Sequence, residues 1–181
     1  MKTILLGVSG SISAYKAADL TNQFVKLGYN VEVLMTASST KFITPLTLQS
    51  LAKNNVHTDV MAEPFPNKIN HIELAKKADL FIVAPASANT IAKLAHGLAD
   101  DILSTVALAL NDKIPKLVAP AMNTQMYKNP LTQRNLTILK EVGYIEIEPR
   151  EAQLACGDFG KGALASPADI ITIVTQVLTK N

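Results

Sequence analysis

The chain has 181 residues, of which 48% are hydrophobic and 18% are charged, and its net charge is +2. This length suits one domain with its own core, and the composition excludes a disordered charged chain. The small net charge and the 5% of aromatic residues argue against a nucleic-acid or membrane surface. The single cysteine excludes an internal disulfide. No apolar run approaches the roughly 20 residues that span a bilayer, so we expect an uncleaved cytoplasmic protein.

Short apolar runs alternate with helical patterns along the chain. The runs that we expect to be strands are Thr3–Val8, Val31–Met35, Leu80–Ala84, Lys116–Ala119 and Tyr144–Ile147. The helices expected around them are Ile12–Lys26, Pro45–Lys53, Ile72–Ala78, Thr90–Leu94, Ile102–Leu110, Leu131–Val142 and Ala168–Leu178. Nearly continuous apolar strands suit a parallel sheet covered on both faces. The alternation therefore predicts a single α/β domain over residues 1–181, with a doubly wound parallel sheet.

Two segments have no such pattern, and we predict irregular loops there. One is residues 57–70, with Pro64 and Pro66, and the other is residues 149–167, with three glycines. Loops of this length in a compact domain are more often functional than not.

Small and polar residues follow the first two expected strands, where ligands bind in such sheets. Gly10 and Ser11 precede a helix, so a phosphate could approach the backbone there, although the segment also suits an ordinary strand–helix turn. The hydroxyls of Thr36, Ser38 and Ser39 stand where a dinucleotide-binding domain often has an acid, which favours a mononucleotide over NAD. An ordinary helix cap explains them equally well.

Further polar residues follow the next two strands. Ser87, Asn89 and Thr90 surround a helix start that needs one cap, and the surplus suggests contacts to a ligand. Asn123 can both donate and accept hydrogen bonds, as recognition of an amide or a carboxylate requires. The alternative is that Asn123 caps a helix while Met122 and the nearby Met126 pack in the core.

The histidines differ in their surroundings. Asn70 and Glu73 have the spacing of a capping box, which places His71 in a first helical turn as a neutral imidazole, suited to act as a base or a hydrogen-bond partner. A structural role is the alternative. For His57 and His96 we expect roles on the surface or at a helix end. The spacing of histidines and cysteine predicts no metal site.

Cys156 lies in a glycine-rich segment. We predict that this segment, about residues 150–166, is a flap that closes over a substrate. Lys161 is near enough in the sequence to favour the Cys156 thiolate.

Five segments, in this order, are similar to motifs of the homo-oligomeric flavin-containing cysteine decarboxylases: Gly10-Ser11-Ile12, His71-Ile72-Glu73-Leu74, Pro85-Ala86-Ser87-Ala88-Asn89-Thr90, Pro120-Ala121-Met122-Asn123 and Ala155-Cys156-Gly157-Asp158. The resemblance covers about residues 5–167. It implies a three-layer, flavodoxin- or Rossmann-like fold that binds FMN between the subunits of a trimer or dodecamer, so that a monomer is inactive.

The resemblance also implies roles for individual residues. FMN is expected near Gly10, Ser11, Ile12, Thr36, Ser38, Ser39, Ser87, Ala88, Asn89 and Thr90, with Ala121 close to its ring. The substrate is expected at Met122, Asn123, Ala155, Gly157 and Lys161. His71 is expected to serve the oxidative half of the reaction and Cys156 to donate a proton in the reductive half.

The implied reaction is FMN-dependent decarboxylation of 4′-phosphopantothenoylcysteine to 4′-phosphopantetheine and CO2, in coenzyme A biosynthesis. It passes through a thioaldehyde and an enethiolate with no net redox change. We expect the single-function form, with a separate phosphopantothenate–cysteine ligase. The alternatives are a peptidyl-cysteine decarboxylase, a flavin prenyltransferase and a non-enzymatic regulatory subunit with an FMN pocket. The Ala155–Leu164 loop favours the complete reaction over the peptidyl-cysteine type, and the presence of His71, Asn123 and Cys156 in one chain argues against a regulatory subunit.

Overall fold

The computed structural model describes residues 1–63 and 66–180. Within them, six strands form one parallel sheet in the order β3-β2-β1-β4-β5-β6. The strands are β1 (Thr3–Val8), β2 (Asn30–Met35), β3 (Val56–His57), β4 (Leu80–Ala86), β5 (Lys116–Pro120) and β6 (Tyr144–Glu146). The predicted doubly wound α/β sheet is thus confirmed. The sequence did not predict β3, because two residues carry no periodic pattern.

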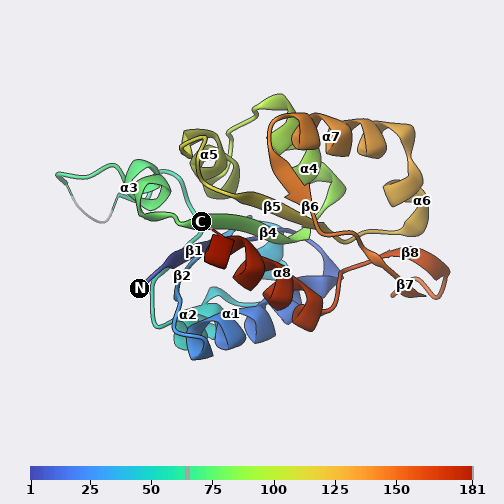
Figure 1. Ribbon diagram of the computed structural model, residues 1–181, viewed down its shortest axis with the longest axis horizontal. Helices are drawn as coiled ribbons and strands as arrows, with labels where there is room; N and C mark the ends of the chain where they lie inside the picture. Colours follow the sequence, from blue (N-terminus) through green and yellow to red (C-terminus); the bar gives the residue numbers. More distant parts are fainter. Residues whose placement is uncertain (64–65, 181) are drawn as a thin grey trace.

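Helices cover both faces of this sheet and make three layers (Figure 1). One face carries α1 (Lys16–Lys26), α2 (Pro45–Ala52) and α8 (Pro167–Lys180). The other carries α3 (Asn70–Lys77), α4 (Ala88–His96), α5 (Ile102–Ala109) and α7 (Pro130–Glu141). Among the described residues, no helix is long and apolar enough to cross a membrane.

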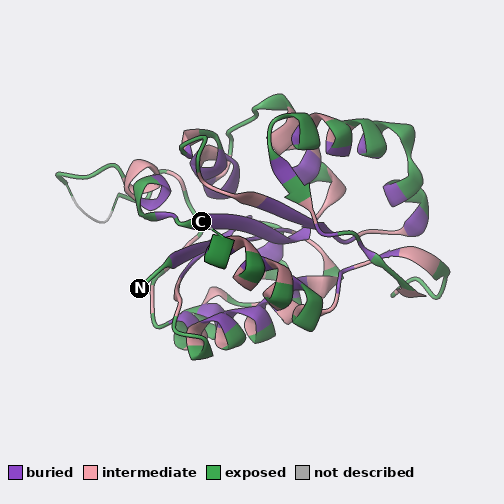
Figure 2. Cartoon of the chain, in the orientation of Figure 1, coloured by how far each residue is buried: buried purple, intermediate pink, exposed green. Residues whose placement is uncertain are grey.

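The core has two parts, one on each side of the sheet. All six residues of β1 are buried, and their side chains alternate between the two parts. Phe24 of α1 fills one side and Phe81 of β4 fills the other, and neither is exposed. Burial of one such side chain contributes roughly 1.5–3 kcal/mol. Figure 2 shows the resulting pattern, with buried strands between helices whose outer faces are exposed.

The strand order reverses between β1 and β4, which makes this the switch point of the sheet. Ser9 lies just after β1 and is fully buried. Its side chain joins the loop after β1 to the loop after β4. Its Oγ donates to the Pro85 carbonyl at 2.8 Å and accepts from the Ser87 N–H at 2.8 Å. Ser9 therefore links the loops that follow β1 and β4 at the switch point.

The segment predicted to be an irregular flap is a β-hairpin, and in this respect the prediction was wrong. β7 (Arg150–Gln153) pairs antiparallel with β8 (Phe159–Ala163), and the hairpin projects beyond the carboxyl ends of the sheet (Figure 1). β7 is largely exposed and polar, and β8 contains two glycines, so neither strand has an apolar alternation to reveal it.

Smaller elements complete the chain. The helix expected over residues 12–26 is divided into a 3₁₀ turn, η1 (Ile12–Tyr15), and α1. Two other short elements, η2 (Ser39–Lys41) and α6 (Thr124–Lys128), were not predicted. In the other segment predicted to be irregular, residues 57–70, β3 and α3 occupy the two ends, and Pro64 lies outside the described residues.

Candidate active site

A cleft of about 520 Å³ lies at the carboxyl ends of β1, β4 and β5, where the β7–β8 hairpin forms one wall. It brings together predicted site residues from four segments that are far apart in the sequence. These residues are Gly10, Ser11, Ile12, Ser87, Ala88, Ala121, Met122, Asn123, Ala155 and Cys156. This position is where doubly wound sheets bind their ligands.

Thr36, Ser38 and Ser39, which follow β2, are not among the described residues that line this cleft. Thr36 and Ser39 bond to each other: the Ser39 N–H donates to the Thr36 Oγ1 at 3.3 Å, and the Ser39 Oγ donates to the Thr36 carbonyl at 2.7 Å. Ser38 packs against Gly10, because a Cβ added to Gly10 would lie 2.5 Å from the Ser38 Cβ. A glycine is therefore required where the two loops meet.

Ser87 caps α4 and also faces the cleft. Its Oγ accepts from the Thr90 N–H at 3.3 Å and contacts the Thr90 Oγ1 at 3.2 Å. Thr90 is buried beneath it, and Asn89 is exposed outside the cleft lining. Of the three polar residues at this helix start, Ser87 is the cap, Thr90 is its buried partner and Asn89 is exposed.

Asn123 has the helix-cap role that the sequence offered as one alternative, and it also lines the cleft. Its Oδ1 caps α6 by accepting from the Gln125 N–H at 2.8 Å, and its Nδ2 lies 3.5 Å from the Cys156 Sγ. The amide that fixes a helix start therefore also presents a donor to the cleft, next to the thiol.

Close backbone contacts hold the hairpin against the loop that carries Asn123. The Met122 N–H donates to the Gly162 carbonyl at 3.0 Å. A Cβ on Gly162 would collide with the Met122 carbonyl, and a Cβ on Gly160 would lie 2.6 Å from the Thr124 Oγ1. These glycines permit a contact that side chains would prevent.

Cys156 lies at the exposed turn of the hairpin, followed by Gly157 at φ +91°. Its Sγ donates to the Asp158 Oδ2 at 3.4 Å, a hydrogen bond that requires the thiol form. The sequence suggested that Lys161 acts on the Cys156 thiol, but in the structure Lys161 has another partner. Its Nζ pairs with Glu148 at 2.5 Å, and this carboxylate raises the pKa of Lys161.

Two cations that sequence reasoning missed line the same cleft. Lys16 begins α1, and Arg150 begins the hairpin, where its Nε donates to the Leu164 carbonyl at 3.1 Å. Burial and the charge of Arg150 lower the pKa of Lys16. No acidic side chain is among the described residues that line the cleft. The sequence signal that could have identified Lys16 as a cleft residue was its place in the first helix after the first strand.

His71 does not reach this cleft within one chain. It is the second residue of α3, which lies at the opposite end of the molecule from the hairpin (Figure 1), and it is absent from the described cleft lining. Its Nδ1 is buried and has no hydrogen-bond partner among the described residues. The predicted capping box is wrong, because Ile69 is the N-cap and the Asn70 side chain contacts His57 instead.

The other histidines have defined partners. The Nε2 of His96, at the end of α4, lies 3.0 Å from the Asn135 Oδ1, which confirms the expected helix-end role. His57 is not a surface residue: its side chain is 13% exposed and it contacts Glu32 and Asn70. This corrects the prediction, which could not anticipate that β2 and α3 enclose it.

Comparison with known proteins agrees with this geometry. Residues 1–179 match the family described as Flavoprotein. The chain belongs to the Flavoprotein family. A probable phosphopantothenoylcysteine decarboxylase of Streptococcus mutans serotype c (strain ATCC 700610 / UA159) is 61% identical over 176 residues, which are 97% of each chain. The coenzyme A biosynthesis bifunctional protein CoaBC of Bacillus subtilis (strain 168) is 49% identical over 175 residues, and this match covers 97% of the chain and 43% of that protein.

Solved structures of similar proteins extend this relationship. A PPC decarboxylase mutant complexed with pantothenoylaminoethenethiol matches with a TM-score of 0.87 and 35% identity over 99% of both chains. The FMN binding protein AtHal3 matches with a TM-score of 0.85 and 36% identity, over 99% of this chain and 98% of that one. Both likenesses include the sheet and the hairpin that form the cleft.

Proposed function

We propose that this member of the Flavoprotein family is an FMN-dependent decarboxylase of 4′-phosphopantothenoylcysteine, which makes 4′-phosphopantetheine and CO2 in coenzyme A biosynthesis. The observation that carries the proposal is the Asn123–Cys156 contact of 3.5 Å inside a cleft at the switch point of the sheet. An amide donor beside a thiol fits a substrate with a carboxylate at its cysteine end. The names of similar proteins support the same substrate.

The chemistry of the cleft fits FMN as its cofactor. Its volume is within the range of roughly 300–1,000 Å³ that is typical of cofactor sites. The described lining includes apolar side chains that suit a flat ring, among them Ile12, Phe42 and Met122, and hydroxyls of Ser11 and Ser87 that suit a polar chain. Gly10 lines the cleft as well, and its lack of a Cβ lets Ser38 pack against the loop after β1. The similarity to an FMN binding protein supports this cofactor.

The residues of the chain divide the proposed reaction between them. FMN, when bound, would supply the two-electron oxidation of the substrate thiol and return the electrons later. The Asn123 Nδ2 binds the substrate carboxylate until it leaves as CO2 and the substrate becomes an enethiolate. The Cys156 thiol then donates its proton from Sγ when that enethiolate is reduced. No net oxidation remains, because the substrate regains the two electrons that it gave.

Lys16 and Arg150 favour a phosphorylated substrate over a peptide. Both line the cleft, and the described residues give neither of them an acidic partner within ion-pair distance. Two cations without a carboxylate attract a dianion such as a phosphate. A peptidyl-cysteine substrate has no such group, which argues against that alternative.

The position of His71 supports an oligomeric enzyme. A single chain does not bring His71 to the cleft, so we propose that His71 of one subunit completes the cleft of a neighbouring subunit in a trimer or dodecamer. We also propose that a separate phosphopantothenate–cysteine ligase acts as a partner in the same pathway. We place both proteins in the cytoplasm.

One assay separates this proposal from a regulatory subunit that only keeps the pocket. The protein is loaded with FMN and mixed with 4′-phosphopantothenoylcysteine that carries an isotopic label in its carboxylate. The proposal predicts that labelled CO2 and 4′-phosphopantetheine form in equal amounts. FMN binding without any CO2 would support the regulatory alternative, and CO2 with an oxidised enethiol as the final product would support the peptidyl-cysteine type of reaction.

A further inference from the structure

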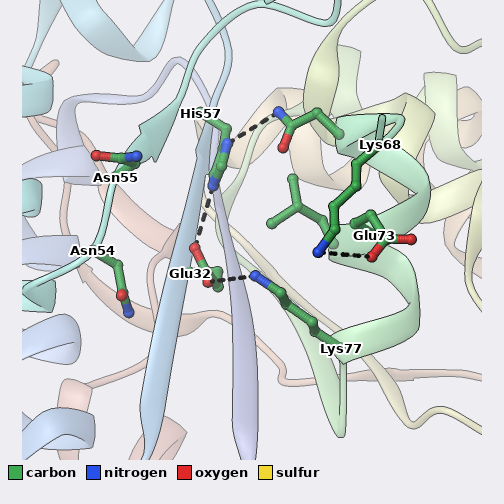
Figure 3. Close-up of a pocket in the computed structure, with 9 residues that line it drawn as sticks. Glu32, Asn54, Asn55, His57, Lys68, Glu73 and Lys77 are labelled. Carbon is green, nitrogen blue, oxygen red and sulfur yellow. Dashed lines mark hydrogen bonds and ion pairs between the residues drawn. The ribbon is translucent and has the colours of Figure 1, made fainter. Parts of the chain in front are cut away.

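A chain of polar side chains outside the cleft joins the sheet to both ends of α3. Glu32 of β2 is 8% exposed, and its carboxylate lies 3.2 Å from the His57 Nε2 and 3.6 Å from the Lys77 Nζ. The His57 Nδ1 lies 3.2 Å from the Asn70 Nδ2. Figure 3 shows Glu32, His57 and Lys77 around a cavity of about 240 Å³. Asn70 and Lys77 are the first and last residues of α3.

The hydrogen bonds that link Glu32, His57 and Asn70 have a defined direction. An amide nitrogen only donates, so Asn70 donates to the His57 Nδ1, and the neutral ring must carry its proton on Nε2. That proton is donated to Glu32. Burial alone would raise the pKa of Glu32, but the hydrogen bonds from His57 and Lys77 and the charge of Lys77 outweigh burial and lower it. Glu32 is therefore a carboxylate at neutral pH and holds both ends of the same helix.

The start of α3 depends on these contacts. Its N-cap, Ile69, has no side chain that can accept a capping hydrogen bond. Asn70 fixes the first turn instead, through its side chain and through its N–H, which donates to the Glu63 Oε2 at 2.8 Å. The next residue is His71, whose buried Nδ1 has no hydrogen-bond partner among the described residues. The contacts that hold the first turn of α3 therefore set the orientation of the His71 ring.

We propose that Glu32, His57 and Asn70 are positioning residues that hold α3 so that the His71 imidazole meets the reacting end of the substrate. This inference rests on the proposed function, in which His71 serves the cleft of a neighbouring subunit. The three residues touch neither cofactor nor substrate and act through the backbone of α3. A displacement of a reacting group by about 1 Å can lower a rate about 100-fold.

Substitutions at Asn70 test this role with the least disturbance of the fold. Asn70→Ala removes the donor to His57 and leaves the His57–Glu32 contact in place. Asn70→Asp restores a link in the opposite sense, because a carboxylate accepts from the Nδ1–H of a doubly protonated His57. Asn55→Ala is the matched control, because Asn55 lines the same cavity but is outside the chain of contacts.

The measurements are the kcat and KM of CO2 release from 4′-phosphopantothenoylcysteine, and the bound FMN per subunit. For Asn70→Ala we expect kcat to fall about 10- to 100-fold with unchanged KM and FMN content. Asn70→Asp should recover most of the loss, and Asn55→Ala should match the wild type. An unchanged kcat in folded, FMN-loaded Asn70→Ala would overturn the proposal, and so would a loss that Asn70→Asp does not reduce.

A spectroscopic measurement separates this proposal from the proposed function. In ¹⁵N spectra of the histidine rings, the wild type should show His57 with its proton on Nε2. Asn70→Ala should shift the ring signals of His71, while Asn55→Ala should leave them in place. Unchanged His71 signals in Asn70→Ala would overturn the positioning role, whether or not the wild type releases CO2. Absence of CO2 release by the wild type would instead refute the proposed function.

Discussion

The Asn123 Nδ2 lies 3.5 Å from the Cys156 Sγ and so joins the loop after β5 to the turn of the β7–β8 hairpin. The hairpin is therefore seated on the loop that carries the proposed carboxylate ligand. This contact joins the amide that we propose binds the leaving carboxylate to the thiol that we propose donates the later proton.

The first prediction concerns the thiol. Cys156→Ser should still release CO2 but accumulate the oxidised enethiol, because a hydroxyl is a much weaker proton donor than a thiol and only the reductive half needs this proton. Mass spectrometry of the products measures the ratio of enethiol to 4′-phosphopantetheine. Glu151→Gln, an exposed change on the same hairpin, serves as the control. A normal yield of 4′-phosphopantetheine from Cys156→Ser would refute the role of this thiol.

The second prediction concerns Asn123. Asn123→Asp keeps the oxygen that caps α6 but replaces the donor with a negative charge, so the fold should persist while the substrate carboxylate is repelled. We expect kcat/KM to fall by about 10- to 100-fold or more, the scale of a lost hydrogen bond to a charged group. Asn129→Asp is the control, because Asn129 caps α7 by the same contact. Equal kcat/KM values for the two variants would contradict the assignment.

The third prediction concerns the seat of the hairpin. Gly160→Ala should lower activity because its Cβ meets the Thr124 side chain, and the further change Thr124→Ala should restore activity by removing that side chain. Gly162→Ala meets the backbone carbonyl of Met122, so Thr124→Ala should not rescue it. Limited proteolysis of the hairpin, measured with activity, tests both. Rescue of both variants, or of neither, would argue against this account of the contact.

The fourth prediction concerns the two cations. Arg150→Gln and Lys16→Met should each raise KM for the phosphorylated substrate by about 10- to 100-fold. KM for the dephosphorylated analogue, pantothenoylcysteine, should change little. Lys26→Met, on the same helix as Lys16 but outside the cleft lining, should behave as the wild type. If the variants weaken FMN binding rather than the preference for the phosphorylated substrate, the cations serve the cofactor and this prediction is wrong.

The fifth prediction concerns Glu32 and pH. The pKa of Glu32 is lowered below its ordinary value of 4.5 in the folded protein. Its contribution to stability is therefore complete above that value and disappears as the pH falls through the lowered pKa. Chemical denaturation between pH 7 and pH 3 should show Glu32→Gln less stable than the wild type at pH 7, with a difference that shrinks in acid. A difference that grows as the pH falls would contradict this sign.

Sequence patterns predicted the parts of the fold that depend on continuous apolar burial. Thr3–Val8 was predicted with its observed bounds, because every residue of β1 is buried. The hairpin and α6 escaped prediction, since they are short and are held by tertiary contacts such as Met122 with Gly162. Lys16 and Arg150 were missed because nothing local shows that two residues so far apart share a cleft. Asn70 was misread because its amide bonds to a neighbouring strand rather than to its own helix.

The central claim is that a flavin held in this cleft makes decarboxylation possible. The most direct test removes FMN from the purified protein, confirms that the fold persists, and measures CO2 release from 4′-phosphopantothenoylcysteine before and after FMN is restored. The account predicts a yellow protein that loses activity with its flavin, regains it when FMN is added, and bleaches under anoxic conditions when Cys156→Ser meets substrate. Equal CO2 release by the folded, flavin-free protein would contradict it.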